Sequence, residues 1–529
     1  MNAGGPWQHK GRWWLKGRLE TRGLLHVGSG ETVTRPELVD ERTRKPAQVS
    51  AVAVGAAGRP YVPGSTLKGV LAGWAADHAG SELVEAVFGS EDRGGGLVFA
   101  DAPLAGDPEP EAPPPYWHRG RRTGVVPRVA IDRRFGTASH RRLFYLEVVP
   151  AGAELTVEVG GDGVTREEMA LALAALEAFN GDLALGAHTG DGWGRMRWHL
   201  EELRHMGSAE VVEWLEDGAQ RPPAEAAAPL SDEALARLLE RAREIAALAP
   251  AGAARAGVDV ELRFDGPFLV RDTDPARAGK GIERPDAVAR RDRHGQPHLP
   301  ASSFRGALRS RAEMILRTLG GDGAACGIDA PREPCRAVES LPEVRRLCPA
   351  CRVFGAAGWR APLRITDFDA GEDGTPLRQH FVAIDRFTGG AARERKFDVE
   401  GVLEPRLTGR LEVDLEALDR AGSGAWAFGL LVLVLRDLVE GDVTFGANAV
   451  RGYGACRAVV GLPSLPAWEA VPEGLRNALG VAPHVLAGPL AWPESSSPLG
   501  EALAAWVREL KSVATAADRA WRESREERS

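Results

Sequence analysis

Long hydrophobic runs are absent from this sequence of 529 residues. The longest, residues 425–435 (AWAFGLLVLVL), is well short of the ~20 residues that a membrane-spanning helix needs. Residues 1–14 (MNAGGPWQHKGRWW) do not contain the apolar core of a secretory signal. The five cysteines are too few for a disulfide framework. We therefore expect a cytoplasmic protein that makes no contact with a membrane.

The chain also lacks an excess of positive charge, since its formal net charge is −8. This average argues only weakly against nucleic acid as a partner, because charges can be segregated into patches. Apolar residues make up 44% and charged residues 26%, as in folded globular proteins. The length indicates two or three domains.

Two parts of the chain repeat the same motifs in the same order. The matched pairs are SAVAVGAAGRPYVPGSTLKGV (50–70) with DAVARRDRHGQPHLPASSFRGA (286–307), VFG (87–89) with VFG (353–355), VAIDRRFGTA (129–138) with VAIDRFTGGA (382–391), and GDLALGAHTGDGWGRMR (181–197) with GDVTFGANAVRGYGACR (441–457). Four ordered matches predict two copies of one domain, over residues 10–200 and 257–462.

The segments outside the repeats differ in composition. Residues 201–256 read as a linker that includes a helix capped by Ser231 and running to about Leu248. Residues 463–529 read as a C-terminal extension with a helix over 499–525.

Each repeat is predicted to be α+β. The expected strands are 12–25, 147–159, 258–270 and 409–415, and the expected helices are 67–78, 169–179, 304–319 and 425–439. This strand–helix–strand, strand–helix–strand order is typical of a ferredoxin-like (RRM-like) fold. Because that fold serves many functions, it does not identify the activity.

Glycine-rich loops close both repeats. Gly192 and Gly194 in the first loop, and Gly452 and Gly454 in the second, permit close approach of the backbone to a ligand. Neither loop lies in a strand–loop–helix with a following lysine, which excludes a P-loop. The alternative is that each loop is only a tight hairpin. Because the glycine-rich loop recurs in both repeats beside an aromatic residue, we favour a surface that binds a sugar–phosphate chain.

Arginines are concentrated in the repeated elements. Residues 119–142 hold eight arginines against one aspartate, and residues 284–311 hold seven against two. A solvated charged face is the alternative reading. Because the acids lie mainly in other segments, we favour a groove for nucleic-acid phosphates. Asp132 and Asp385, each in an AIDR motif, are expected to pair with neighbouring arginines.

Four of the five cysteines lie close together in the sequence. Cys326, Cys335, Cys348 and Cys351 form the pattern C-x8-C-x12-C-x2-C. Four thiolates at this spacing suit one tetrahedral, structural Zn²⁺ per chain. The first repeat lacks such a cluster, so the segment 326–351 is predicted to be an insertion that braces one copy. Cys456 is expected to be a small buried residue.

One acid distinguishes the two copies. The repeat alignment places Asp286 opposite Ser50. A carboxylate at this point, among arginines, has the chemistry to bind Mg²⁺ or to orient a 2′-hydroxyl. From the residues alone, a solvated turn aspartate is the simpler reading.

The combined motifs resemble the backbone RAMP-superfamily subunits of type III CRISPR effector complexes, and the fusion of two such domains is similar to subtype III-D-like effectors. The motifs that carry the resemblance are LHVGSGE (25–31), PYVPGSTLKGVL (60–71), LPASSFRGALRSR (299–311), CPACRVFG (348–355), AIDRFTGGA (383–391) and the two terminal glycine-rich loops. The element FLVRDTD (268–274) replaces LHVGSGE in the second copy.

The resemblance implies that both domains bind CRISPR RNA and that complementary target RNA and other complex subunits are partners. Thumb-like hairpins are expected near residues 104–127 and 371–379. The expected RNA contacts are Ser65, Lys68, Arg133, Arg134, Gly192, Gly194, Ser302, Ser303, Arg305, Arg309, Arg386, Gly452 and Gly454.

By the same resemblance, the target RNA is cut with Mg²⁺ or Mn²⁺ at a loop aspartate that matches Asp286. The predicted activity is that of an RNA-guided endoribonuclease, active only in the assembled antiviral complex. Ser50 predicts a silent first domain, unless Asp40 reaches in from the preceding loop. The main alternative is a non-catalytic RNA-binding scaffold. A standalone guide-processing nuclease and a zinc-ribbon DNA-binding protein fit fewer of the motifs.

Overall fold

The computed structural model describes most of the chain. The described residues are 11–39, 46–106, 110, 113–132, 138–181, 183–248, 254–272, 285–292, 295–327, 330–371, 374–461, 463–464, 468–480 and 497–526. The chain divides into two compact units, the first made of residues 1–126, 144–189 and 193–251, and the second made of residues 127–143, 190–192 and 252–529.

The main sheet of the first unit has five strands in the order β11-β10-β1-β9-β5. They are β1 (Arg12–Thr21), β5 (Leu97–Phe99), β9 (Glu154–Asp162), β10 (Met196–Met206) and β11 (Ala228–Pro229). All of these pairings are antiparallel. With β11 set aside, the first strand lies between the third and the fourth, as the predicted ferredoxin-like order requires.

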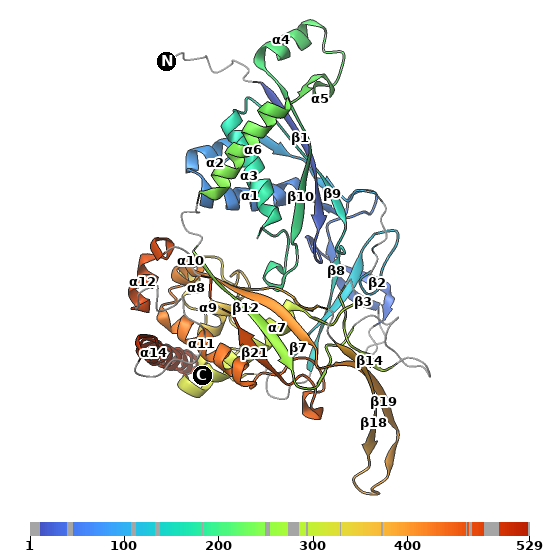
Figure 1. The fold of residues 1–529 in the computed structure, drawn as a ribbon, viewed down its shortest axis with the longest axis vertical. Coiled ribbons are helices and arrows are strands. Elements are labelled where there is room, and N and C mark those ends of the chain that lie inside the picture. Colours follow the sequence, from blue (N-terminus) through green and yellow to red (C-terminus); the bar gives the residue numbers. More distant parts are fainter. Residues whose placement is uncertain are drawn as a thin grey trace. The chain divides into compact units, whose positions relative to one another are not determined.

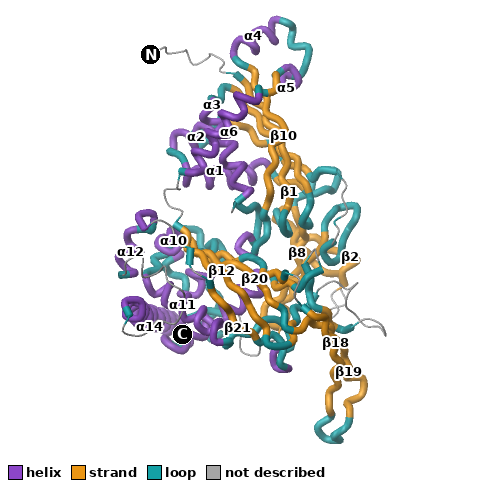
Figure 2. Tube along the Cα trace, viewed as in Figure 1, coloured by secondary structure: helices purple, strands orange, loops and turns teal. Residues whose placement is uncertain are grey.

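Helices cover one face of this sheet (Figure 2). The helices of the unit are α1 (Gly64–His78), α2 (Ser81–Phe88), α3 (Arg166–Glu177), α4 (Ser208–Glu216), α5 (Pro223–Ala226) and α6 (Asp232–Ala247). Alternate residues of β1, among them Trp13, Leu15 and Leu19, are buried beneath the helices. The predicted cap of α6 is confirmed, since the Ser231 side chain accepts a hydrogen bond from the backbone N–H of Ala234.

A second sheet in the N-terminal half has the order β2-β3-β8-β7. Its strands are β2 (Gly28–Val39), β3 (Pro46–Val52), β7 (Gly124–Ile131) and β8 (Ala138–Val148), and β4 (Tyr61–Val62) pairs separately with β6 (Ala102–Pro103). The single strand predicted over 147–159 is wrong. β8 ends at Val148 and β9 begins at Glu154, because Pro150 and the positive φ of Gly152 make a turn between them.

The second unit repeats this topology. Its main sheet has the order β15-β17-β20-β12-β21, with β16 also paired to β20. The strands are β12 (Arg255–Phe264), β15 (His298–Leu299), β16 (Leu363–Ile365), β17 (Phe368–Ala370), β20 (Arg406–Asp414) and β21 (Cys456–Val460). The helices are α7 (Ala301–Gly320), α8 (Leu341–Val344), α9 (Pro349–Phe354), α10 (Leu415–Arg420), α11 (Ala425–Glu440), α12 (Glu473–Leu479) and α14 (Pro498–Glu526).

A long two-stranded hairpin extends from the second unit (Figure 1). It is made by β18 (Thr375–Ile384) and β19 (Ala391–Leu403), and the short strands β13 (Pro267–Phe268) and β14 (Ala287–Val288) pair with its base. The predicted position, 371–379, covers only the start of this hairpin. In the first repeat, 104–127 precedes most of the β7–β8 pair. In the second repeat the turn lies instead at the AIDR motif, where residues 385–390 separate the two strands.

The C-terminal helix α14 packs against α7 and α11. It buries Leu503, Trp506, Leu510 and Ala514 against the core of the second unit. The extension therefore completes the hydrophobic core of that unit. No helix among the described residues is long and apolar enough to cross a membrane.

Candidate functional site

The repeated P-[GA]-S motif places a helix N-terminus in each copy. Helix α1 begins at Gly64, directly after Pro63, and α7 begins at Ala301, directly after Pro300. Carboxylates from elsewhere cap both helices. Asp101 Oδ1 accepts a hydrogen bond from the N–H of Gly64 at 2.8 Å, and Asp367 Oδ1 accepts one from the N–H of Ala301 at 2.7 Å.

Neither aspartate belongs to one of the four repeated motifs. In each copy the aspartate lies two residues beyond the end of a short strand, β5 or β16. The repeat therefore contains a further matched position that a comparison of motifs alone does not reveal. A carboxylate at a helix N-terminus is stabilised by the helix dipole and by the N–H groups it accepts from.

The predicted RNA contacts on these helices are of two kinds. Ser65 and Ser303 are exposed, and Ser302 and Lys68 are half-buried. The two arginines of α7 that were predicted to contact RNA, Arg305 and Arg309, are instead engaged within the unit. Their predicted contact with RNA stays a prediction, but it would compete with the partners described next.

Arg305 and Arg309 lie largely inside the second unit. Arg305 donates to the carbonyl of Leu363 at 2.9 Å, and burial lowers the pKa of its guanidinium. Arg309 donates to Glu313 at 2.9 Å and to the Cys351 sulfur at 3.1 Å. Both side chains therefore tie α7 to neighbouring segments, and Arg309 adds positive charge beside a thiol.

The glycine-rich loops need their glycines for their own geometry. Gly192, Gly194, Gly452 and Gly454 all have φ between 72° and 83°. A Cβ on Gly194 would lie 1.8 Å from the carbonyl oxygen of Leu185, and one on Gly454 would lie 1.9 Å from that of Phe445. The tight-hairpin reading is thus correct for these two glycines. A Cβ on Gly452 would meet nothing within 4 Å, so this position is open to a ligand.

The second glycine-rich loop packs on the base of the hairpin. The Tyr453 hydroxyl donates to Gln379 Oε1 at 2.5 Å. The Arg451 guanidinium lies 4.9 Å from the ring centre of Phe397 and 5.6 Å from that of Phe381. These contacts join the loop and the hairpin into one surface.

The hairpin tip is exposed and carries an aromatic side chain. Asp385 Oδ1 accepts hydrogen bonds from the N–H groups of Phe387 and Thr388, so the expected pairing of Asp385 with an arginine is replaced by a turn. Phe387 is fully exposed, and Arg386 beside it is exposed as well. Arg133 and Arg134, at the matching position of the first repeat, lie outside the described residues.

Asp286 lies at the base of the hairpin, immediately before β14. Its N–H donates to the carbonyl of Asp398, and its Oδ2 accepts a hydrogen bond from the N–H of Asp398, both at 2.9 Å. The carboxylate thus replaces a backbone carbonyl at the end of the strand pairing, and the residue remains exposed. A free turn aspartate would lack this fixed position.

Ser50 occupies the matching place in the first repeat. It lies in β3, half-buried, opposite Leu146 in the parallel β3–β8 pair. Asp40 lies outside the described residues.

The acids do not form a preassembled metal cluster around Asp286. Two groups of three or more His, Cys, Asp or Glu side chains converge within 4.8 Å in the part of the chain that the structure describes, and Asp286 belongs to neither. One group is Asp437, Glu440 and Asp442, where Arg311 and Arg436 neutralise Asp437. Mg²⁺ is commonly held by one or two carboxylates together with substrate phosphates, so Asp286 fits this ion only with RNA present.

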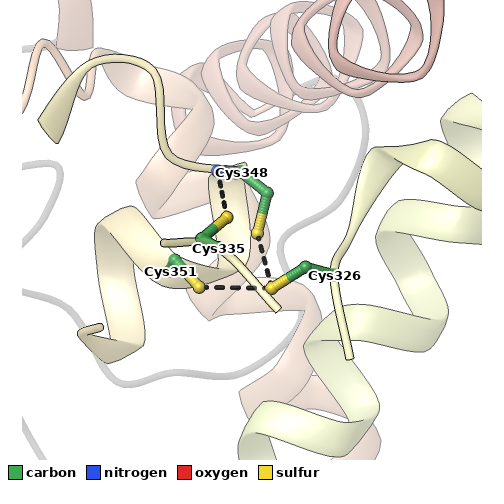
Figure 3. Close-up of side chains that lie close together, drawn as sticks. All are labelled: Cys326, Cys335, Cys348 and Cys351. Carbon is green, nitrogen blue, oxygen red and sulfur yellow. Dashed lines mark hydrogen bonds between the residues drawn. The ribbon is translucent and has the colours of Figure 1, made fainter. Parts of the chain in front are cut away.

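The other group is the four cysteines (Figure 3). Their sulfurs lie within 4.8 Å of one another, with Cys326 3.4 Å from Cys351 and 3.5 Å from Cys348. Zn–S bonds of about 2.3 Å in a tetrahedron set sulfurs about 3.8 Å apart, so the spacing is compatible with a zinc site. Hydrogen bonds from the other three thiols hold the pKa of Cys348 well below its usual value.

Local structure explains why these cysteines converge. Cys348 caps α9, Pro349 starts that helix, and Cys351 lies on its first turn. Cys326 arrives from the end of α7, through the short 3-10 helix Asp322–Ala324. Cys456 is separate and buried, as predicted, and burial raises its pKa to about 12.

Comparison with known proteins adds one match. The model of the RAMP superfamily matches residues 18–197 and 214–457, which is most of the chain. No curated protein matches the sequence. The two matched regions correspond to the two copies of the fold.

Proposed function

Because the chain belongs to the RAMP superfamily, we propose that it is a CRISPR RNA-binding backbone subunit of a type III effector complex, and that its second domain cuts complementary target RNA. The family indicates a CRISPR-associated RNA-binding module built from two tandem RAMP domains. The subtype III-D-like arrangement belongs to the proposal. The observation that carries the cutting role is the exposed, fixed carboxylate of Asp286, where the first copy has the half-buried Ser50.

The RNA-binding surface in this proposal has two parts. The exposed serines Ser65 and Ser303, in the first turns of α1 and α7, have hydroxyl groups that can donate to a phosphate. In the second unit, the glycine-rich loop and the hairpin offer open space at Gly452 and a cation at Arg451. The hairpin tip, with Phe387 and Arg386, is suited to stack on a base and contact a phosphate, as a thumb would.

The cut itself is assigned to the residues around Asp286. Its carboxylate would orient the 2′-hydroxyl of the target for attack on the adjacent phosphate. A divalent metal bound there with phosphate oxygens would stabilise negative charge as it develops. Ser50 offers no carboxylate, and we propose that the first domain only holds RNA.

The cysteine cluster has a structural role in this proposal. Four sulfur ligands leave no open position on Zn²⁺, so the ion would brace the segment between α7 and α9. Arg309, bonded to the Cys351 sulfur, offsets part of the negative charge of four thiolates.

The test is target cleavage by the reconstituted complex with its guide RNA. Asp286→Ala should remove one cut, or slow it by at least ~100-fold, while target binding persists. Asp286→Asn retains an oxygen for the Asp398 N–H and should also fail to cut. Wild-type cutting should require Mg²⁺ or Mn²⁺ and stop with EDTA.

Ser50→Ala is the matched control, because it changes the equivalent position of the first copy. It should leave every cut in place. If Asp286→Ala also leaves every cut in place, the chain is a non-catalytic guide-binding scaffold. Among the described residues, no three-ligand cluster forms at Asp286, which favours that second function.

A further inference from the structure

A row of three ionisable side chains crosses the base of the hairpin. Asp286 pairs with Asp398 of β19 through two hydrogen bonds, one donated by the backbone N–H of each residue. On the other side of β19, His380 of β18 is the cross-strand partner of Asp398. The imidazole Nδ1 lies 2.5 Å from Asp398 Oδ1, so it donates to that carboxylate.

This contact fixes the imidazole with its other nitrogen outward. The side chain of His380 is 57% exposed and that of Asp398 is 23% exposed. With Nδ1 bonded to Asp398, Nε2 is the nitrogen that can meet a ligand. Adjacent strands are about 4.8 Å apart, so the backbones at His380 and Asp286 lie roughly 10 Å apart, with Asp398 between them. That span admits a phosphodiester between the two side chains.

The first repeat carries no carboxylate or histidine at the matching positions. Ser50 matches Asp286 and has Leu146 as its strand partner. Alignment of VAIDRRFGTA with VAIDRFTGGA, extended without gaps, places Pro127 opposite His380 and Tyr145 opposite Asp398. The whole row differs between the copies, although the strand arrangement around it is the same. This difference parallels the proposed division of roles, in which only the second copy cuts.

We propose that His380 is the proton donor of the cut, oriented by Asp398, with Nε2 delivering its proton to the leaving 5′-oxygen of the target RNA. This inference rests on the proposed cutting role of the second domain. The 2′-oxygen bonds to phosphorus while the bond from phosphorus to the 5′-oxygen breaks. The 2′-hydroxyl proton leaves to a water molecule at Asp286, and the electrons of the broken bond stay on the 5′-oxygen. The imidazolium proton neutralises that oxygen, and solvent then reprotonates the imidazole.

The other charged groups around His380 are unsuited to this step. Arg378 lies 3.5 Å from Asp398 Oδ2, and the charge of Lys396 also acts on Asp398. Glu400 is the cross-strand partner of Arg378. Arginine and lysine keep their protons near neutral pH, whereas histidine exchanges its proton there. The pKa of Asp398 is held below its usual value, first by the hydrogen bond from His380, so Asp398 stays an anion that orients the ring.

The experiment compares two target RNAs in the reconstituted complex, one natural and one with sulfur in place of the bridging 5′-oxygen at the cut. His380→Gln should slow the natural RNA by ~100-fold, with target binding unchanged. A thiolate leaves without protonation, so the same variant should cut the sulfur RNA within a few-fold of wild type. Asp398→Asn should slow cleavage of the natural RNA by a smaller factor than His380→Gln does. It should also cut the sulfur RNA within a few-fold of wild type.

Glu404→Gln is the control, since it removes an exposed charge just beyond the end of β19, away from Asp398. It should leave the sulfur effect unchanged. If His380→Gln cuts natural RNA at the wild-type rate, or slows both RNAs equally, the assignment of His380 is wrong. That result leaves the role of Asp286 intact, provided that Asp286→Ala is inactive on both RNAs. A wild-type complex that cuts nothing overturns the proposed function and this inference together.

Discussion

At the scale of the residue, the carboxylate of Glu147 in β8 binds side chains and a backbone N–H from several separate segments. It is fully buried and accepts hydrogen bonds from Arg121 at 3.0 and 3.1 Å, from Thr123 at 2.7 Å and from the Val52 N–H at 3.1 Å. Arg35, itself buried, forms an ion pair with the same carboxylate. Burial raises the pKa of Glu147, but the bonds from Arg121 and Thr123 and the nearby charges hold it below its usual value.

Glu147→Gln should therefore destabilise the chain by about 3 kcal/mol, because it leaves the charge of Arg35 buried without its partner. Since the folded-state pKa lies below the unfolded value of about 4.3, the carboxylate contributes stability above that pH. The contribution is lost as the pH falls through the folded-state value. Urea unfolding at several pH values measures both effects. Glu158→Gln, on an exposed position of β9, should change neither; equal losses in the two variants would contradict the argument.

At the scale of the element, residues 326–351 form a loop that carries the four clustered cysteines. The position of this cysteine loop depends on neighbouring elements as well as on its thiols. Gly323, just before the loop, donates its N–H to Asp518 of α14 at 2.7 Å. Arg332, within the loop, donates to the carbonyl of Gly323 at 2.8 Å. The C-terminal helix therefore holds the start of the loop in place. Bonds from Arg522 and from the Gly323 N–H keep the pKa of Asp518 below its usual range.

Freshly purified protein should contain about one zinc per chain by elemental analysis. Cys348→Ser should lower the zinc content, and chelation of the wild type should lower its melting temperature, because metal binding is coupled to folding of the loop. Cys456→Ser removes the isolated thiol and should leave the zinc content unchanged. Metal-free protein with an unaltered melting temperature would exclude the structural zinc.

At the scale of the whole molecule, an acidic chain is proposed to bind a polyanion. The net charge is −8, yet the cations at the hairpin and its adjoining loop, Arg451 and Arg386, lie on exposed elements. Other arginines, such as Arg305 and Arg309, are engaged inside the fold. The number of phosphates that the protein can bind therefore depends more on where the fold places its arginines than on how many arginines it has.

Guide-RNA affinity should accordingly fall linearly with salt on logarithmic axes, with a slope of about −0.7 per neutralised phosphate. Arg386→Gln should make the slope shallower by about 0.7 if the hairpin tip contacts one phosphate. Arg263→Gln is the matched control, because Arg263 pairs with Glu261 on β12. Filter binding between 50 and 300 mM salt, about the range in which such slopes are measured, gives both values. A slope unchanged by Arg386→Gln would remove the tip from the RNA-binding surface.

The sequence by itself determined the features that rest on local pattern. Repeated motifs predicted two copies of one α+β fold, because the same residues at the same spacing make the same elements. Helix α6 was predicted from Ser231 and its apolar spacing, and a C-terminal helix was predicted over 499–525, where α14 lies. The pattern C-x8-C-x12-C-x2-C predicted the cysteine cluster, since short loops keep such ligands close. The comparison of the two copies singled out Asp286, and its catalytic role was predicted from the family resemblance.

Only the tertiary structure decided which distant residues meet. Asp286 and Asp398 are 112 residues apart, and strand register alone brings them together and sets His380 in the same row. Register depends on pairing along whole strands, which no single motif encodes. For the same reason, Asp101 and Asp367 appeared as helix caps only in the fold. Arg309 was predicted to contact RNA from its charge, but packing of α7 directs it toward Cys351.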